Sequence, residues 1–125
     1  MRTVASRFLV VLLASAVLGA PAASAASLGW MKGQAAQFFT DTDWKLLRET
    51  LTAALDEASD GEAREWRNDK SKASGRITPL ASQTQDDVTC RRVRIESSAA
   101  GVENSYRYLF CRRAEGPWGI GMPKD

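Results

Sequence analysis

The sequence predicts an α+β domain in which one N-terminal amphipathic helix packs on a small antiparallel sheet of four to five strands, closed by one disulfide. Three observations support this fold class. Apolar residues recur at helical spacing over 44–58, short extended segments separated by polar turns follow from residue 62 onward, and the two cysteines fall within these segments. A helix followed by a meander of strands is typical of α+β domains.

Residues 1–25 have the three parts of a cleavable signal peptide. Arg2 and Arg7 give a positive start, an apolar stretch covers 8–18, and Ala-Ser-Ala at 23–25 forms a small-residue cleavage site. We therefore expect cleavage after residue 25 and export to the periplasm or to the outer-membrane or cell surface. An uncleaved membrane anchor is the alternative, although such an anchor needs about 20 apolar residues.

Removal of residues 1–25 changes the charge balance. The whole chain of 125 residues has 17 basic and 15 acidic side chains, and Arg2 and Arg7 leave with the signal. The remaining charge is balanced, which does not favour nucleic-acid binding. The remaining length fits one domain, which we divide into a flexible arm without a clear period, 26–39, and a folded part, 40–125.

Cys90 and Cys111 are the only cysteines, so the exported chain has one possible disulfide. Such a bridge stabilises the fold by about 3 kcal/mol in the chain-entropy model. Free thiols or metal ligands are the alternative. Because the sequence contains no histidine, a four-ligand zinc site would need acidic partners, and we expect no metal site.

The helix is expected to begin after Thr40. Thr40 and Asp43 have the spacing of a capping box, and Gly61 can adopt the left-handed conformation that follows a helix. We interpret the apolar stripe as a core face, with a partner-binding face as the alternative. The stripe consists of Trp44, Leu47, Leu51, Leu55 and Ala58.

Extended segments follow the helix, and polar stretches separate them. Pro79 places the second segment at a sheet edge or near its own end, because proline cannot donate a ladder hydrogen bond. The polar stretches 68–75, 81–87 and 96–104 are interpreted as turns and loops. The expected strands are 62–67, 76–80, 88–95, 105–113 and a short last strand at 118–120.

The third and fourth strands form a hairpin whose register the cysteines define. If Cys90 lies opposite Cys111, the apolar side chains of both strands fall on one face, and a one-residue slip would scatter them. Opposed residues of a pair without hydrogen bonds have Cα atoms about 4.5 Å apart, which a disulfide accepts. The core-facing set is Val93, Ile95, Tyr106, Tyr108 and Phe110, and the other face carries Arg92, Arg94, Arg107 and Leu109.

The sequence contains no recognisable catalytic apparatus. The absence of histidine excludes histidine-dependent triads and general bases, and the scattered glycines form no phosphate-binding loop. Carboxylate pairs such as Asp86 and Asp87 have the positions of caps, helix surfaces and loops. A small hydrolase would need two carboxylates across a cleft. We therefore expect a non-enzymatic protein without a cofactor.

Six arginines cluster in the two strands of the hairpin. Alternation places Arg92, Arg94 and Arg107 together on the outer face, where guanidinium groups can bind carboxylate or phosphate. We name these three as a possible site for an anionic envelope polymer, a lipid head group or a protein partner. The alternative is the ordinary solvent-facing side of a one-sided sheet. The other members of the cluster are Arg91, Arg112 and Arg113.

Several short motifs occur in a fixed order over about 40–120. They are Ala54-Leu55-Asp56, Asp60-Gly61-Glu62, Trp66-Arg67-Asn68, Gly75-Arg76-Ile77-Thr78-Pro79, Cys90-Arg91, Cys111-Arg112 and Glu115-Gly116-Pro117-Trp118. This ordered set resembles the C-terminal domain of the bacterial 17 kDa surface antigen family, the rickettsial and Legionella-type outer-membrane surface antigens. The resemblance implies an envelope location and a non-enzymatic role. Family members carry a lipid-attachment cysteine at the cleavage site, where this sequence has Ala26, so a lipid anchor is not implied.

These features predict an exported cell-envelope protein that acts as a small binding or structural module. Its partner would be an envelope component or another protein. The alternative is a periplasmic inhibitor or accessory protein that docks on an envelope enzyme through the arginine-rich sheet face.

Overall fold

The computed structural model describes residues 34–121, which form two helices and one five-stranded sheet. The helices are the 3-10 helix η2 (Gln34–Phe38) and the α-helix α1 (Asp41–Glu57). The strands are β1 (Arg64–Arg67), β2 (Ser74–Gln85), β3 (Val88–Ala99), β4 (Val102–Arg113) and β5 (Gly119–Ile120).

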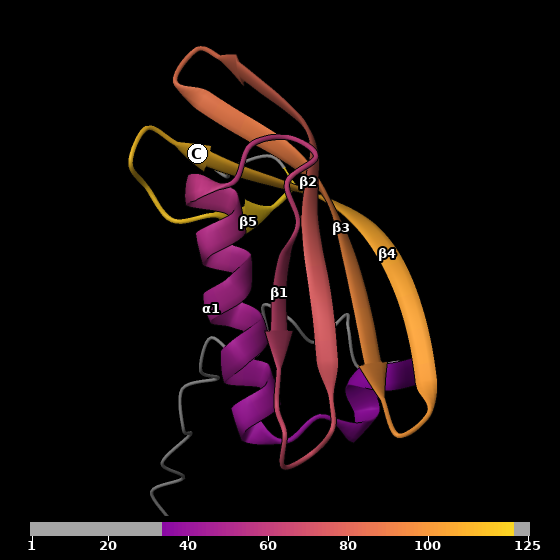
Figure 1. Ribbon diagram of the computed structural model, residues 1–125. Helices are drawn as coiled ribbons and strands as arrows, with labels where there is room; N and C mark the ends of the chain where they lie inside the picture. Colours follow the sequence, from indigo (N-terminus) through magenta and orange to yellow (C-terminus); the bar gives the residue numbers. More distant parts are fainter. Residues whose placement is uncertain (1–33, 122–125) are drawn as a thin grey trace, which may run out of the picture.

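The sheet is an antiparallel meander in the order β1-β2-β3-β4-β5, with α1 packed along one face (Figure 1). The expected α+β fold is confirmed, with one α-helix, five antiparallel strands and a disulfide between Cys90 and Cys111. The expected signal peptide, 1–25, and the first part of the expected arm, 26–33, lie outside the described residues.

The start of α1 is the predicted capping box. The backbone N–H of Asp43 donates to the Thr40 hydroxyl at 3.2 Å, and the backbone N–H of Thr40 donates to the Asp43 carboxylate at 2.9 Å. The helix ends at Glu57, and Gly61 has a φ of 86° in the turn that follows. Trp44, the first residue of the predicted stripe, is half-buried, and the other four residues are buried. The stripe is therefore a core face. The four buried residues are Leu47, Leu51, Leu55 and Ala58.

The last residues of the expected arm form η2. Ala35 and Ala36 are buried, and the backbone N–H of Ala35 donates to Asn104 Oδ1 of β4 at 3.0 Å. Whereas α1 packs mainly on β1 and β2, η2 packs on β3 and β4 (Figure 1). Small alanine side chains permit this close approach. A single 3-10 turn is too short to produce a helical period, which is why the pattern indicated an arm.

The core lies between the helices and the sheet. Ile77 of β2, together with Val93 and Ile95 of β3, is completely buried. The ring of Phe39 lies 5.3 Å, centroid to centroid, from both Trp44 and Trp66 in edge-to-face contacts. Such pairs stabilise the fold beyond their burial alone. The aromatic cluster joins the start of α1 to β1.

β2 is longer than predicted. The expected strand was 76–80, followed by a loop at 81–87, but the strand extends from Ser74 to Gln85. Pro79 lies in its middle, next to a register shift between Pro79 and Ala81. The Pro79 carbonyl accepts a hydrogen bond from Gly61 N–H at 2.6 Å, in the segment that precedes β1. The missing proline N–H therefore faces a side where β1 has not yet begun, and its absence removes no ladder hydrogen bond.

Two tight turns replace the loops expected at 81–87 and 96–104. Asp86 and Asp87 have φ values of 49° and 64°, and Ala100 and Gly101 have values of 50° and 78°. Positive φ at both central residues is the geometry of two-residue hairpin turns. Polar side chains in these segments suggested loops, yet polar residues also suit strands whose one face is open to solvent.

The hairpin of β3 and β4 has the predicted register. Cys90 lies opposite Cys111, and their Cα atoms are 4.1 Å apart. Val93 lies opposite Tyr108, as the polarity of the two strands required. The predicted short last strand is β5, which pairs with Phe110 and Cys111 of β4.

Candidate functional site

The arginines named from the sequence lie on the outer face, the side of the sheet opposite α1. Arg94 of β3 is directly opposite Arg107 of β4, and Arg92 is opposite Leu109. Arg92 and Arg107 are exposed, and Arg94 is half-buried. Both described helices pack on the other face. The structure therefore brings the three arginines together on an open surface.

The three guanidinium groups have no partner within residues 34–121, where no hydrogen bond or ion pair involves the side chains of Arg92, Arg94 or Arg107. The Nε of Arg94 is also shielded from solvent and lacks an acceptor. Like charges directly across two strands destabilise each other. An anion placed between Arg94 and Arg107 would relieve this repulsion and accept charge-assisted hydrogen bonds from both.

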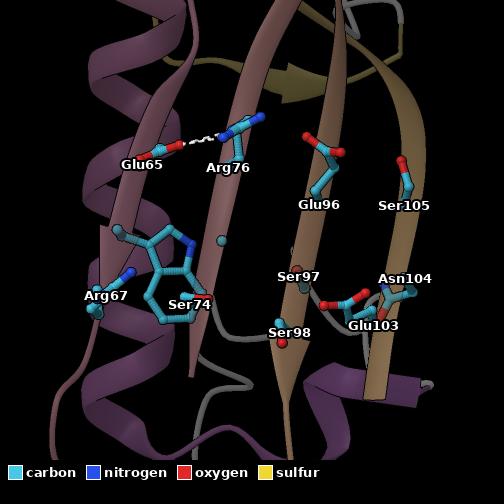
Figure 2. Close-up of a pocket in the computed structure, with 12 residues that line it drawn as sticks. Glu65, Arg67, Ser74, Arg76, Glu96, Ser97, Ser98, Glu103, Asn104 and Ser105 are labelled. Carbon is cyan, nitrogen blue, oxygen red and sulfur yellow. Dashed lines mark hydrogen bonds and ion pairs between the residues drawn. The ribbon is translucent and has the colours of Figure 1, made fainter. Parts of the chain in front are cut away.

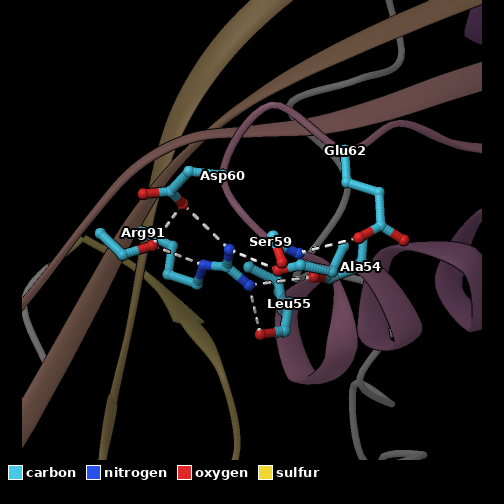
Figure 3. Close-up of polar contacts among 8 residues, drawn as sticks. Ala54, Leu55, Ser59, Asp60, Glu62 and Arg91 are labelled. Carbon is cyan, nitrogen blue, oxygen red and sulfur yellow. Dashed lines mark hydrogen bonds and ion pairs between the residues drawn. The ribbon is translucent and has the colours of Figure 1, made fainter.

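Arg91, the next residue along β3, does not belong to this surface. Its side chain is only 9% exposed, and it lies on the core-facing side at the C-terminal end of α1 (Figure 3). Its two terminal nitrogens donate to the carbonyl oxygens of Ala54, Leu55 and Ala58 at 2.7–3.0 Å. Leu55 and Ala58 lie at the helix end, where carbonyls lack intrahelical partners, and the Ala54 carbonyl also accepts the Ala58 N–H at 3.1 Å. Arg91 therefore caps α1.

Asp60 and Ser82 complete the junction around Arg91. Arg91 Nη2 donates to the Asp60 carboxylate at 3.0 Å, and Arg91 Nε donates to the Ser82 hydroxyl at 2.7 Å. Ser82 in turn donates to the same Asp60 oxygen at 2.7 Å. The Ser82 hydrogen bond and the Arg91 guanidinium hold the pKa of Asp60 below its ordinary value. The sequence indicated that Arg91 points away from the outer face, because the predicted register placed it opposite Phe110 on the core-facing side.

Arg112 is also engaged within the fold. Its guanidinium lies over the Trp118 ring, 4.6 Å from the centroid, and 3.3 Å from the Asp56 carboxylate of α1. Trp118 Nε1 donates to the same carboxylate at 2.8 Å. Of the arginine cluster, Arg91 and Arg112 therefore fasten α1 to the sheet.

A hollow of about 640 Å³ lies across β1 to β4 at one end of the outer face (Figure 2). Its charges are mixed. Glu65 and Arg76 form an ion pair of 2.7 Å that raises the pKa of Arg76. Glu96 and Glu103 lie on neighbouring strands of the same hollow, opposite Ser105 and Ser98 respectively. Hydroxyl and carboxylate groups make this end a polar surface.

A second hollow of about 730 Å³ lies at the other end of the outer face, around the disulfide. Arg92 and Arg113 contribute positive charge, and Asp86 contributes negative charge. Its apolar lining consists of Ala81, Val88, Cys90 and Leu109. Arg94 and Arg107 lie between the two hollows along β3 and β4, so they form the centre of the outer face. Neither hollow was predicted, because each combines side chains from several strands.

Residues 34–121 hold no cluster of three or more side chains suited to bind a metal ion. Within the same residues, neither helix has the length and apolar character needed to cross a bilayer.

Several motif residues that carry the family resemblance lie at contacts between elements. Gly61 hydrogen-bonds Pro79, and Trp66 packs over Gly75. The other such contacts join Arg91 to Ala54 and Leu55, Arg112 to Asp56, and Asn68 to the helix start at Asp43. These motif residues build the scaffold. The outer-face arginines 92, 94 and 107 lie outside the motifs.

No protein-family model, curated protein or solved structure matches the chain.

Proposed function

We propose that the protein is an exported, non-enzymatic module of the cell envelope that binds an anionic envelope component through its outer sheet face. The observation that carries the proposal is the pair of opposed arginines, Arg94 and Arg107, which lack any partner within residues 34–121. Arg92 adds a third positive charge at the border of the second hollow. Arginine forks suit phosphate and carboxylate groups, which anionic polymers and lipid head groups present.

Sequence features support the location and the absence of catalysis. The signal-peptide pattern at 1–25 supports export, and a disulfide between Cys90 and Cys111 is typical of an oxidising compartment. The chain has no histidine, and both cysteines are used in the bridge. The ordered motifs support membership of the 17 kDa surface antigen family, which implies an envelope location.

The proposal is tested with the processed protein purified from its host. We expect co-sedimentation with purified lipopolysaccharide or with phosphatidylglycerol vesicles, and none with phosphatidylcholine vesicles. Replacing Arg92, Arg94 and Arg107 by Gln should weaken binding about tenfold or more, because each charge-assisted hydrogen bond contributes about 1.5–3 kcal/mol. Glutamine keeps much of the side-chain stem that covers the sheet.

A matched control variant distinguishes a specific binding site from a general effect of net charge. The variant with Gln at Arg48, Lys70 and Lys72 loses the same charge from exposed positions on α1 and the β1–β2 turn. It should bind like the original protein. Equal loss in both variants, or no binding of either probe by the original protein, would refute an anion site at the outer face.

A second candidate function rests on the mixed charges of the first hollow. Glu96 and Glu103 lie near Arg94 and Arg107 on the same face, a pattern that matches a protein surface better than a uniformly anionic polymer. In this case the protein is an inhibitor or accessory subunit of an envelope enzyme. Cross-linking in the host envelope should then recover one enzyme whose activity changes when the protein is added, and Glu96→Arg should reduce the effect.

A further inference from the structure

Within residues 34–121, the backbone of β4 has no partner strand along most of one edge. β5 pairs only with Phe110 and Cys111, and no other strand within residues 34–121 lies on that side of β4 (Figure 1). The pairing of β4 with β3 continues from Val102 to Arg113 without an irregularity. The free part of β2 differs, because it carries Pro79 and a register shift. A long regular edge is a template for one more strand.

The direction of the backbone groups at this edge follows from one hydrogen bond. Gly121 N–H donates to the carbonyl of Leu109 at 2.8 Å, so the backbone groups of Leu109 point towards the β5 side. Along an antiparallel strand, alternate residues point their N–H and C=O groups to the same side. Glu103, Ser105 and Arg107 therefore direct their backbone groups to the free edge. Their side chains are exposed on the outer face.

We propose that two copies of this chain pair antiparallel through their β4 strands, about a two-fold axis at Ser105. In this register Ser105 faces Ser105 of the second copy. Glu103 of each copy faces Arg107 of the other, and opposite charges directly across two strands stabilise the pair. The two sheets become one continuous sheet with both outer faces on the same side, as a closed two-fold interface requires.

Other registers lack this complementarity. A shift of the pairing by two residues puts Glu103 opposite Ser105 or opposite Leu109, and no acidic side chain then faces Arg107. A shift by one residue would turn the outer face of one copy to the core-facing side of the other. The charge pattern of β4 thus matches a second copy of itself in one register.

The core-facing side of β4 also favours a second copy. Tyr106 and Tyr108 are half-buried, with ring centroids 6.0 Å apart, and they lie beside the part of the sheet that α1 does not mainly cover. In the proposed register they face Asn104 and Val102 of the second copy. Pairing would remove further aromatic surface from water, which drives association.

The dimer and the proposed function are separable. In the dimer, Glu103 of the second copy neutralises Arg107, whereas Arg92 and Arg94 stay on the continuous outer face. A variant with Gln at Arg92 and Arg94 should lose anion binding and remain a dimer. Anion binding by the dimer then depends on Arg92 and Arg94, and loss of anion binding without loss of the dimer distinguishes the two proposals.

A charge exchange tests the interface on the processed chain by sedimentation equilibrium. The original protein should be a dimer, whereas Glu103→Arg and Arg107→Glu should each raise the dimer dissociation constant about tenfold or more, because each places two like-charged pairs across the axis. Mixing the two variants should restore a dimer, since Arg then faces Glu at both positions. Lys70→Glu, in an exposed turn, should not change the dissociation constant.

The outcomes that overturn the proposal are a monomeric original protein, single variants that dimerise like it, or folded variants that do not associate when mixed. Circular dichroism melting establishes that each variant is folded.

Cross-linking tests the axis independently. Opposed residues of a hydrogen-bonded antiparallel pair have Cα atoms about 5.5 Å apart, within the range of a disulfide. Ser105→Cys should therefore form a covalent dimer on mild oxidation. Ser98→Cys, on the outer face of β3, should not. Equal cross-linking of both variants, or none by Ser105→Cys, refutes the axis.

Discussion

Arg91 and Arg92 are consecutive residues of β3 with opposite environments. Arg91 points to the core-facing side, where it donates hydrogen bonds to two carbonyls of the last helical turn, the carbonyl of the C-cap residue Ala58, a carboxylate and a hydroxyl. Arg92 points to the outer face and has no partner within residues 34–121. Strand alternation alone separates the two roles. One arginine therefore belongs to the scaffold and its neighbour to the candidate binding surface.

Loss of Arg91 should destabilise the fold strongly. Arg91→Ala leaves the end of α1 and the Asp60 carboxylate without their donors, and we expect the free energy of unfolding to fall by about 3 kcal/mol. Arg91→Lys should recover little, because an ammonium group lacks the planar fork that reaches several acceptors. Urea unfolding measures both. Arg92→Ala is the control and should change stability by no more than about 0.5 kcal/mol. Similar losses of stability in Arg91→Ala and Arg92→Ala would contradict the role of Arg91 as the cap of α1.

The pairing of β1 with β2 depends on the contact between Trp66 and Gly75. The two residues lie opposite each other, and the Trp66 indole occupies the space that a side chain at position 75 would need. A Cβ there would collide with Trp66 Nε1 and lie 2.8 Å from the Glu96 carbonyl oxygen. Glycine is required here by close approach, so the motif containing Gly75 is a packing motif.

Gly75→Ala should therefore lower stability by about 1–3 kcal/mol through overpacking. The same substitution in a Trp66→Leu background should cost less, because the indole that it meets is gone. A thermal or urea double-mutant cycle measures this coupling. Gly119→Ala is the matched control, since a Cβ at that position meets no atom within 4 Å. Additive effects of the Trp66 and Gly75 substitutions would show that the contact is not the cause.

The molecule as a whole is held together by fastening both ends of α1 to the sheet. At the C-terminal end, Asp60 and Arg91 form the junction shown in Figure 3. At the N-terminal end, the buried Asp43 carboxylate accepts hydrogen bonds of 2.7 Å from Asn68 and Ser71 in the β1–β2 turn. Burial raises the pKa of Asp43, but hydrogen bonds from the Thr40 backbone and these two side chains outweigh it and lower the pKa overall.

Lowering the pH should break the contacts that the Asp43 and Asp60 carboxylates make at the two ends of α1. A carboxyl whose pKa is lower in the folded state binds fewer protons there, so its contribution to stability is complete above the unfolded pKa of about 3.9 and is lost as the pH falls through the folded value. We expect the free energy of unfolding, measured in urea, to decrease from about pH 5 downward. Asp43→Asn should be less stable at pH 7 by about 2 kcal/mol and should show a weaker pH dependence.

The control for this prediction is Asp69→Asn, at an exposed position of the same turn. It should retain the original pH profile. If the free energy of unfolding of Asp43→Asn depends on pH in the same way as that of the original protein down to about pH 2, Asp43 does not hold the helix to the sheet.

The residue pattern specified those features that local periodicity encodes. The capping box and stripe located α1, and the positions of Cys90 and Cys111 gave the register that places Arg92, Arg94 and Arg107 on one face. These features depend on repeats of two or 3.6 residues, which are visible within a single segment. The fold class and the composition of the outer face followed from them.

Other features depended on what lies beside a segment in space. The polar stretch 81–85 is a strand because β3 accepts its backbone hydrogen bonds, and residues 34–38 form a helix because β3 and β4 bury two of its alanines. The two hollows and the Arg91 cap combine side chains from several elements. Neighbouring elements supply the hydrogen-bond partners and the burial, so a polar or irregular segment acquires its structure only when the chain has folded around it.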